Sequence, residues 1–404
     1  MQEITMKDVL MVLPHMVGGG AERVASLLVN SFQDNHIRAS VVLTSDKSED
    51  VVRCDLKEDI PLILLQESMK SESVGEKIKF LPAKIISKIL CRIYEKLGKT
   101  VPSYLAYLSM IWQYHREIHA IREMMCEKPE MTVVVFLQPA IPIVLLAVRD
   151  LPNKVIISER CDPNRLMKKR YGKAFIEKYY ERANAAVFQT EEAKAVYPAN
   201  VSKKGCVIFN PLKDKLPEPF QGCRNHVITT FCRISEQKNL PILLEAFYLL
   251  HKDYPEYQLK IIGDAPNEEG KRVVDDIKKR IEELDLEGKV SLLPFSKNVH
   301  EEILEDAMYV NSSDYEGISN AMLEAMAIGM PVVCTDCPIG GAHATIQHEV
   351  NGMLVPVRDA QAMYLAMKKI IEDEELARRI SSNAAKLRET LSLENIAKQW
   401  MELL

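Results

Sequence analysis

Val9-Leu-Met-Val-Leu13 is a continuous apolar run, and Gly18-Gly-Gly20 and a helix-like stretch from Ala21 to Gln33 follow it. A strand without polar residues is typical of a parallel sheet that is covered on both faces. Further apolar runs alternate with helical patterns, at Val41–Thr44, Leu62–Leu65, Val133–Leu137, Val155–Ile157 and Ala185–Phe188. This alternation predicts an α/β domain with a parallel sheet between two layers of helices.

The pattern stops at Asn210-Pro211 and then starts again, which predicts a second domain of the same kind. We expect a first domain over 1–208, a linker over 209–222, a second domain over 223–390 and a terminal helix over 391–404 that packs back on the first domain. The two sheets are expected to face a central cleft, because ligands bind at the carboxyl ends of parallel strands. The second domain has strand candidates at Val227–Phe231, Leu259–Ile262, Val290–Leu293, Met308–Val310, Pro331–Cys334 and Met353–Val355.

Composition excludes several classes of protein. The net charge of −5 argues against nucleic acid as the main partner, because a polyanion would be repelled. Nine cysteines without framework spacing indicate reduced thiols and a cytoplasmic protein. The polar first residues do not resemble a signal peptide, and the longest apolar stretch, 133–148, is short for a membrane span.

Residues 77–99 break the alternation, at the start of a predicted insertion over about 76–128. They carry seven cations and one acid, and their isoleucines recur at helical intervals. Two interpretations remain open. A basic amphipathic helix is typical of a segment that lies on an anionic membrane surface, which would make the protein peripheral to the inner face of a membrane. Alternatively, the apolar stripe packs on the domain as part of its core. The cationic residues are Lys77, Lys79, Lys84, Lys88, Arg92, Lys96 and Lys99.

Glu316-Gly-Ile-Ser-Asn320 follows a short predicted strand and leads into a helix from about Ala321 to Ile328, with Asn320 as the expected N-cap. Free N–H groups at such a helix start favour a diphosphate, so the donor-binding residues are predicted to be Gly317, Ile318, Ser319 and Asn320. Glu316 and Glu324 could face the same ligand. The alternative is that Glu324 complements the helix dipole and Glu316 is a solvated acid.

Arg233 and Lys238 directly follow the first strand of the second domain. Two cations at this strand end could neutralise a leaving diphosphate. The alternative is a pair of solvated surface cations.

The glycines Gly18, Gly19 and Gly20 would let the backbone approach a phosphate or a sugar closely. They fail as a dinucleotide fingerprint, because Arg23 stands where a third glycine is needed, and this argues against a dehydrogenase. His15 precedes the loop and is either a ligand contact or a structural histidine.

Residues from about Phe231 to Val357 resemble the C-terminal domain of retaining GT-B glycosyltransferases of family 4, among them capsular and surface-polysaccharide members. The resemblance implies two Rossmann-like domains, a UDP-hexose or UDP-N-acetylhexosamine donor and a glycan or polyprenyl-diphosphate-linked acceptor. It also implies that Arg233 and Lys238 bind the pyrophosphate, that Glu316 lies beside the transferred sugar and that Glu324 binds the ribose. Gly18–Arg23 and Ser158–Pro163 also resemble family segments.

Two departures from the family pattern stand out. Cys232 replaces the usual glycine before the pyrophosphate arginine, and its side chain could narrow the donor pocket. The histidine that touches the sugar in many members is missing after Val133–Leu137, and Gln138 or Arg160 is the candidate substitute.

No Asp-x-Asp pair occurs, so we expect no metal cofactor. Two other functions remain open: a nucleotide-sugar epimerase with the same fold, which needs acid and base groups around the sugar, and a non-catalytic partner of another transferase.

Overall fold

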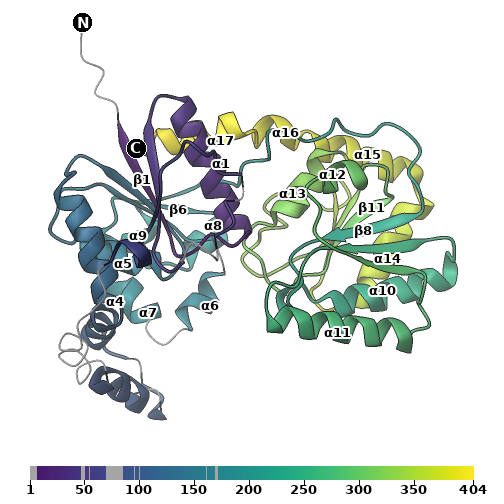
Figure 1. Ribbon diagram of the computed structural model, residues 1–404. Helices are drawn as coiled ribbons and strands as arrows, with labels where there is room; N and C mark the ends of the chain where they lie inside the picture. Colours follow the sequence, from purple (N-terminus) through teal and green to yellow (C-terminus); the bar gives the residue numbers. More distant parts are fainter. Residues whose placement is uncertain are drawn as a thin grey trace, which may run out of the picture. The chain divides into compact units, whose positions relative to one another are not determined.

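The computed structural model describes residues 7–46, 51–53, 55–69, 85–94, 96–99, 101–160, 162–168 and 172–404. The chain divides into two compact units (Figure 1): Met1–Phe209 with Ile396–Leu404, and Asn210–Asn395. The predicted linker over 209–222 therefore starts at the boundary between the units, and Asn210 and the residues after it group with the second unit.

The first unit contains a parallel sheet of seven strands in the order β3-β2-β1-β4-β5-β6-β7. The sequence predicted six of these strands and missed β7, a three-residue edge strand. The strands are β1 Asp8–Leu13, β2 Arg38–Leu43, β3 Leu62–Leu64, β4 Thr132–Phe136, β5 Val155–Ser158, β6 Ala185–Phe188 and β7 Gly205–Val207. The helices are α1 Gly20–Asp34, α2 Leu65–Ser68, α4 Ser103–Cys126, α5 Ala140–Ala147, α6 Pro163–Met167, α7 Gly172–Tyr179, η2 Tyr180–Arg182, α8 Glu191–Ala195 and α9 Ala199–Ser202.

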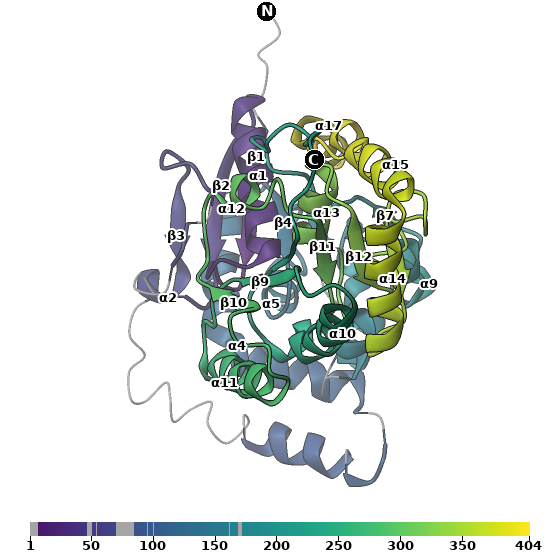
Figure 2. The same cartoon turned by 90° about the vertical axis from the view of Figure 1, so that its right-hand side faces the viewer.

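The second unit contains a parallel sheet of six strands in the order β10-β9-β8-β11-β12-β13. Helices α10 and α14 pack against each other beside it (Figure 2). The strands are β8 Val227–Phe231, β9 Gln258–Ile262, β10 Val290–Leu293, β11 Met308–Asn311, β12 Val332–Thr335 and β13 Met353–Val355. The helices are η3 Glu236–Lys238, α10 Leu240–Asp253, α11 Glu268–Glu283, α12 Val299–Glu302, α13 Asn320–Ala327, α14 Ala360–Glu372, α15 Glu374–Ala385 and α16 Leu387–Thr390. The last helix, α17 Leu393–Met401, crosses the boundary and belongs to the first unit from Ile396 on.

Both sheets have a point where the chain reverses the direction in which it adds strands. In the second sheet β8 lies beside β9 on one side and β11 on the other, and β11 continues to β12. The loops after β8 and β11 therefore leave in opposite directions and open a crevice at the carboxyl ends of the strands. In the first sheet the corresponding reversal lies between the neighbouring strands β1 and β4.

Each sheet has its own apolar core, because nearly every strand residue near the centre is buried on both faces. The end of the chain belongs to the first core. Trp400 of α17 is fully buried, and its ring centre lies 5.5 Å from that of Phe136 at the end of β4. The Lys7 Nζ also donates a hydrogen bond of 2.9 Å to the Leu404 carbonyl.

The predicted basic helix is only partly described, because Lys77, Lys79 and Lys84 lie outside the described residues. Residues 85–94 are helical, and their isoleucines Ile85, Ile89 and Ile93 are 45–49% exposed. The interpretation that these isoleucines pack on the core is therefore wrong. Within the described part of the chain, no helix combines the length and the apolar character that crossing a membrane requires.

Candidate functional site

Lys238 and Glu316 form an ion pair at the carboxyl ends of β8 and β11. The distance from the Lys238 Nζ to the Glu316 Oε1 is 2.5 Å, and the two side chains are only 16% and 14% exposed. Lys238 ends η3, directly after β8, and Glu316 lies in the loop between β11 and α13. Since β8 and β11 are neighbours in the sheet, residues 78 positions apart meet at its switch point. The alternative of a solvated cation and a solvated acid is wrong for this pair.

Further hydrogen bonds hold the two loops together. The Ser313 hydroxyl donates to the Glu316 Oε1 at 2.8 Å, and the Gln237 Nε2 donates to the Glu316 Oε2 at 3.2 Å. Asn239 donates to the Asp314 carboxylate at 2.8 Å. Because both carboxylate oxygens of Glu316 accept bonds from fixed groups, the orientation of this side chain is determined before any ligand binds.

The charges of the site depend on one another. Burial alone would lower the pKa of Lys238, but the Glu316 carboxylate outweighs it and raises the pKa above its usual value. Arg233 is exposed at the same end of β8. Cys232 directly precedes Arg233 in the chain, and burial raises the pKa of its thiol. The site therefore holds a buried, paired lysine, an exposed arginine and a neutral thiol.

Helix α13 begins beside Glu316, but its N-cap differs from the prediction. Ser319 is the N-cap, and its hydroxyl accepts a hydrogen bond from the Met322 N–H at 3.3 Å. The predicted N-cap, Asn320, instead accepts a hydrogen bond of 2.6 Å from Asn210. The backbone at Gly317 is closely approached by Gly341, where a Cβ would lie 1.5 Å from the Gly317 carbonyl oxygen. Ile318 is buried, so the loop is packed in place.

Glu324 lies one turn into α13 and has a partner that the sequence did not reveal. Its Oε2 lies 2.8 Å from the His300 Nε2, and both side chains are nearly buried. The His300 ring also meets the Phe231 ring edge-on, with centroids 5.7 Å apart. Glu324 is therefore held by a buried histidine rather than only complementing the helix dipole.

In the first unit, the glycine loop binds a carboxylate of its own chain. The Glu22 Oε2 accepts hydrogen bonds from the N–H groups of Val17 at 2.9 Å and Gly19 at 2.5 Å. The Glu22 Oε1 lies 3.0 Å from the His15 Nδ1. Gly18 has a φ of +91°, which a residue with a side chain rarely adopts. These two loop N–H groups are thus engaged by Glu22 and are not free for a phosphate.

Arg160 is buried, and its guanidinium packs against two aromatic rings. Its guanidinium lies 4.7 Å from the ring centre of Phe136 and 5.4 Å from that of Trp400. Burial lowers the pKa of Arg160 to about 9. The other candidate, Gln138, follows β4 and donates a hydrogen bond of 3.0 Å to Glu159, whose carboxylate also accepts one from Tyr180 at 2.5 Å. Arg160 thus joins α17 to the sheet, and Gln138 belongs to a separate polar cluster.

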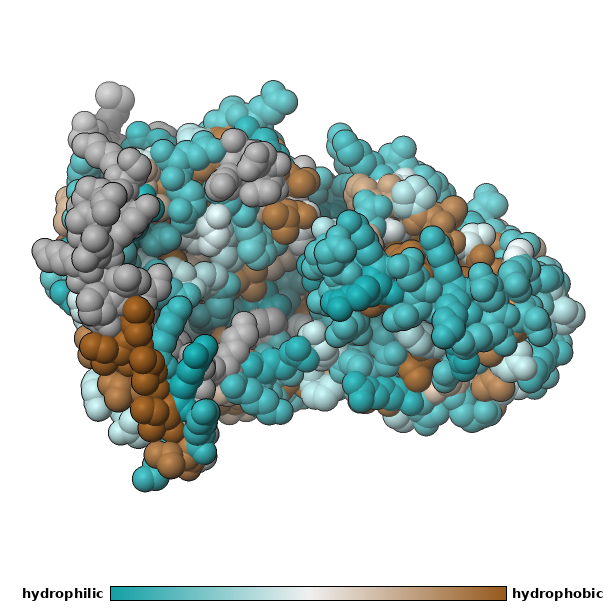
Figure 3. All heavy atoms as spheres, turned by 60° about the horizontal axis from the view of Figure 1, so that its bottom comes forward, coloured by the Kyte–Doolittle hydropathy of each residue, from teal (hydrophilic) through white to brown (hydrophobic). Residues whose placement is uncertain are grey.

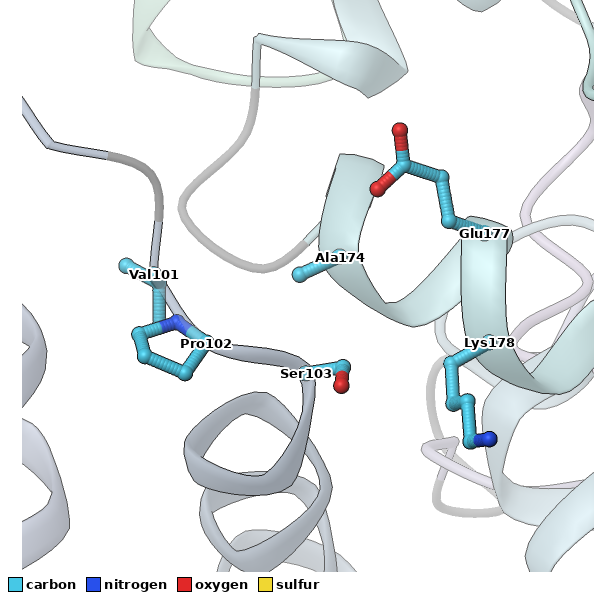
Figure 4. Close-up of a pocket in the computed structure, with 6 residues that line it drawn as sticks. All are labelled: Val101, Pro102, Ser103, Ala174, Glu177 and Lys178. Atoms are coloured by element: carbon cyan, nitrogen blue, oxygen red, sulfur yellow. The ribbon is translucent and has the colours of Figure 1, made fainter.

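A hollow of about 320 Å³ lies in the first unit between the start of α4 and helix α7. Figure 4 shows that Glu177 and Lys178 point in different directions from α7. Their opposite charges indicate no ligand class, and none of the predicted site residues lines the hollow; the lining residues are Val101, Pro102, Ser103, Ala174, Glu177 and Lys178. Among the residues that the structure describes, no three His, Cys, Asp or Glu side chains cluster as metal ligands.

Proteins of related sequence are named glycosyltransferases. An uncharacterized glycosyltransferase of Haemophilus influenzae is 27% identical over 180 residues, which cover 45% of this chain and 49% of that protein. An N-acetylgalactosaminyltransferase of Campylobacter jejuni, named for a diphospho-undecaprenol acceptor, is 31% identical over 165 residues, which cover 41% of this chain and 42% of that protein. The chain spans 23–49% of the length of the first three curated relatives.

Solved structures extend the similarity to the whole fold. HepE of Anabaena in complex with UDP superposes with a TM-score of 0.75 at 18% identity, covering 98% of this chain and 99% of HepE. At this identity the comparison concerns the fold alone. The chain has the GT-B fold of two Rossmann-like domains, and within it residues 223–387 match the family of group 1 glycosyl transferases.

Proposed function

We propose that the protein is a glycosyltransferase of polysaccharide biosynthesis. It would move a hexose or an N-acetylhexosamine from a nucleotide diphosphate sugar, with UDP as the nucleotide, to a glycan or lipid-linked glycan. The observation that supports this proposal most directly is the buried pair of Lys238 and Glu316. The pair lies at the switch point of the second sheet, where folds of this kind bind their ligands.

The reaction needs positive charge where the diphosphate leaves. When the bond between the anomeric carbon and the diphosphate breaks, Lys238 and Arg233 would neutralise the charge that develops on the leaving oxygen. N–H groups at the start of α13 add partial positive charge. Glu316 would position the sugar, and Glu324 would accept hydrogen bonds from the ribose hydroxyls.

We propose that the anomeric configuration is retained without a protein nucleophile. The acceptor oxygen would attack from the face that the diphosphate leaves, and the leaving phosphate oxygen would take the acceptor's proton. The products are then the glycoside and the protonated nucleoside diphosphate. No metal is required in this scheme, because Arg233, Lys238 and the helix start provide the positive charge.

Donor and acceptor are proposed from chemistry and from relatives. HepE was solved with UDP and with UDP-glucose, which supports a UDP-sugar donor. The C. jejuni relative supports a polyprenyl-diphosphate-linked acceptor. We propose that the acceptor binds the first unit beside His15 and Gly18–Gly20. A lipid-linked acceptor would bring the enzyme to the inner face of a membrane.

The test begins with a thermal-shift panel of nucleotide sugars, since a bound ligand stabilises the fold by mass action. Transfer from the best donor is then measured with and without EDTA. Lys238→Ala and Glu316→Ala are expected to lower kcat about 100-fold or more, as loss of a charge-stabilising group does. A matched control exists in the exposed pair of Lys369 and Glu349, whose atoms are 2.6 Å apart.

Each outcome separates the candidates. Near-normal transfer by both Lys238→Ala and Glu316→Ala would contradict the proposal, provided that Lys369→Ala and Glu349→Ala are also normal. An epimer that forms from the donor alone would favour the epimerase. Donor binding without transfer to any matched acceptor would favour a non-catalytic partner. The anomeric configuration of the product, read by NMR coupling constants, tests retention.

A further inference from the structure

The helix over residues 85–94 is attached to the first unit through a narrow face. Cys91 is fully buried and Ser87 is 5% exposed. Cys91 packs with Val101 and Leu105, and Tyr94 packs against the same cluster. Residues three or four positions apart share one side of a helix, so Ser87, Cys91 and Tyr94 form the attached face. The other described side chains of this helix, from Ile85 to Ile93, are exposed.

An apolar face lies next to the attached one. Its main residues are Ile85, Ile86, Ile89, Ile93 and Leu97, at 47%, 56%, 49%, 45% and 63% exposure, and Leu90 is 38% exposed. Figure 3 shows a continuous hydrophobic ridge at the place where Figure 1 draws this helix. Single exposed apolar residues are common, but a contiguous group on one helix marks an interaction surface.

Cations border the apolar face. Lys88, Arg92 and Lys96 recur every four residues, which places them along one line of the helix, and Lys99 follows. All four side chains are exposed. In Figure 3 a row of hydrophilic side chains runs beside the hydrophobic ridge. In a dimer formed through this face, the cations of the two copies would repel each other. An anionic lipid surface would attract them.

We propose that this membrane-binding face, made of Ile85, Ile86, Ile89, Ile93, Leu97, Lys88, Arg92, Lys96 and Lys99, docks on a bilayer that contains anionic lipids. The helix lies in the plane of the interface, with the isoleucines among the acyl chains and the cations at the phosphates. The purpose of membrane binding rests on the proposed function, because an enzyme docked on the bilayer can reach a lipid-linked acceptor. Binding itself is measured without any transfer reaction.

The experiment is co-sedimentation of the full chain with vesicles of phosphatidylcholine, with and without one third phosphatidylglycerol. Wild type is expected to bind the anionic vesicles and to be released by high salt. The variant Lys88→Gln/Arg92→Gln/Lys96→Gln is expected to bind about a hundredfold more weakly, at roughly fivefold, or about 1 kcal/mol, per cation. Ile89→Ser/Ile93→Ser is expected to lose at least about tenfold.

Matched controls test the same changes elsewhere. Arg272→Gln/Lys278→Gln/Lys279→Gln removes three exposed cations from α11, and Leu365→Ser removes an exposed leucine from α14. Both controls should bind like wild type. Circular dichroism and UDP binding, measured on every variant, exclude unfolding as the cause of a loss.

Three results would overturn the inference: equal binding of wild type to both vesicle types, equal losses in the controls, or self-association without lipid that Ile89→Ser/Ile93→Ser abolishes. Vesicle binding by a protein that uses no sugar donor would contradict the proposed function and leave the membrane face standing.

Discussion

Replacing Glu316 by Gln should destabilise the second unit, and UDP should recover part of the loss. The wild-type lysine and carboxylate are 2.5 Å apart and only 16% and 14% exposed. Removing one partner of a buried ion pair costs about 3–5 kcal/mol, because the other charge stays buried without compensation. The glutamine oxygen still accepts a hydrogen bond from Lys238, so we expect a smaller loss than this range, about 2–3 kcal/mol.

The pH dependence of this effect has a definite sign. In the wild type the pKa of Lys238 is raised above its usual value, because Glu316 outweighs burial. The stability that the pair contributes is therefore fully present below the pKa of an unfolded lysine, about 10.4, and is lost as the pH rises through the higher folded value. In Glu316→Gln the opposing carboxylate is gone and burial lowers the pKa of Lys238 instead, so the sign should reverse: stability should rise as the pH increases toward the pKa of an unfolded lysine.

Hydrogen exchange is the suitable assay, because it reports on the second unit separately from the first. Peptides that cover 227–240 and 308–324 should exchange faster in Glu316→Gln, and UDP should slow them again, since its diphosphate offers Lys238 a new anion. Glu349→Gln breaks an exposed pair and should cost less than about 1 kcal/mol. The reasoning is refuted if the loss in Glu316→Gln is no larger than in Glu349→Gln, or if UDP recovers none of it.

Three further predictions concern other parts of the chain. Glu22→Ala leaves the N–H groups of Val17 and Gly19 without their acceptor and should cost the first unit about 1–3 kcal/mol in chemical denaturation. Burial would raise the pKa of Glu22, but hydrogen bonds from His15 and Gly19 outweigh it and lower the pKa. The stability that the Glu22 carboxylate contributes should therefore be lost in the wild type as the pH falls below about 4.5. Glu22→Gln should remove this pH dependence. His300→Leu should raise the KM for the donor more than it changes kcat, with His300→Gln intermediate, whereas equal KM values would exclude His300 as the residue that positions Glu324. Trp400→Ala should cost about 3–5 kcal/mol in thermal unfolding of the first unit, and a loss below 1 kcal/mol would mean that α17 does not contribute to its core.

Several elements were readable from local sequence because their signal is local. β8, β10 and β13 have the predicted bounds, since apolar runs bordered by polar turns leave little freedom in a buried parallel sheet. The meeting of Lys238 and Glu316 was predictable too, because both follow strands whose carboxyl ends share one edge. β7 was missed because it is a three-residue edge strand that starts with a glycine, which weakens the local strand signal.

The remaining features depend on contacts between distant residues, and periodicity does not encode them. The sequence by itself determined the alternation of strands and helices that makes the two α/β domains. It also determined that Lys238 follows one strand and Glu316 follows another. Only the tertiary structure decided that His300 holds Glu324, that Glu22 occupies the glycine loop, and that Ser87 and Cys91, rather than the isoleucines, attach the basic helix. The physical reason is that a helix repeats every 3.6 residues whichever of its faces is buried, so the choice of face is made by the partner it packs against.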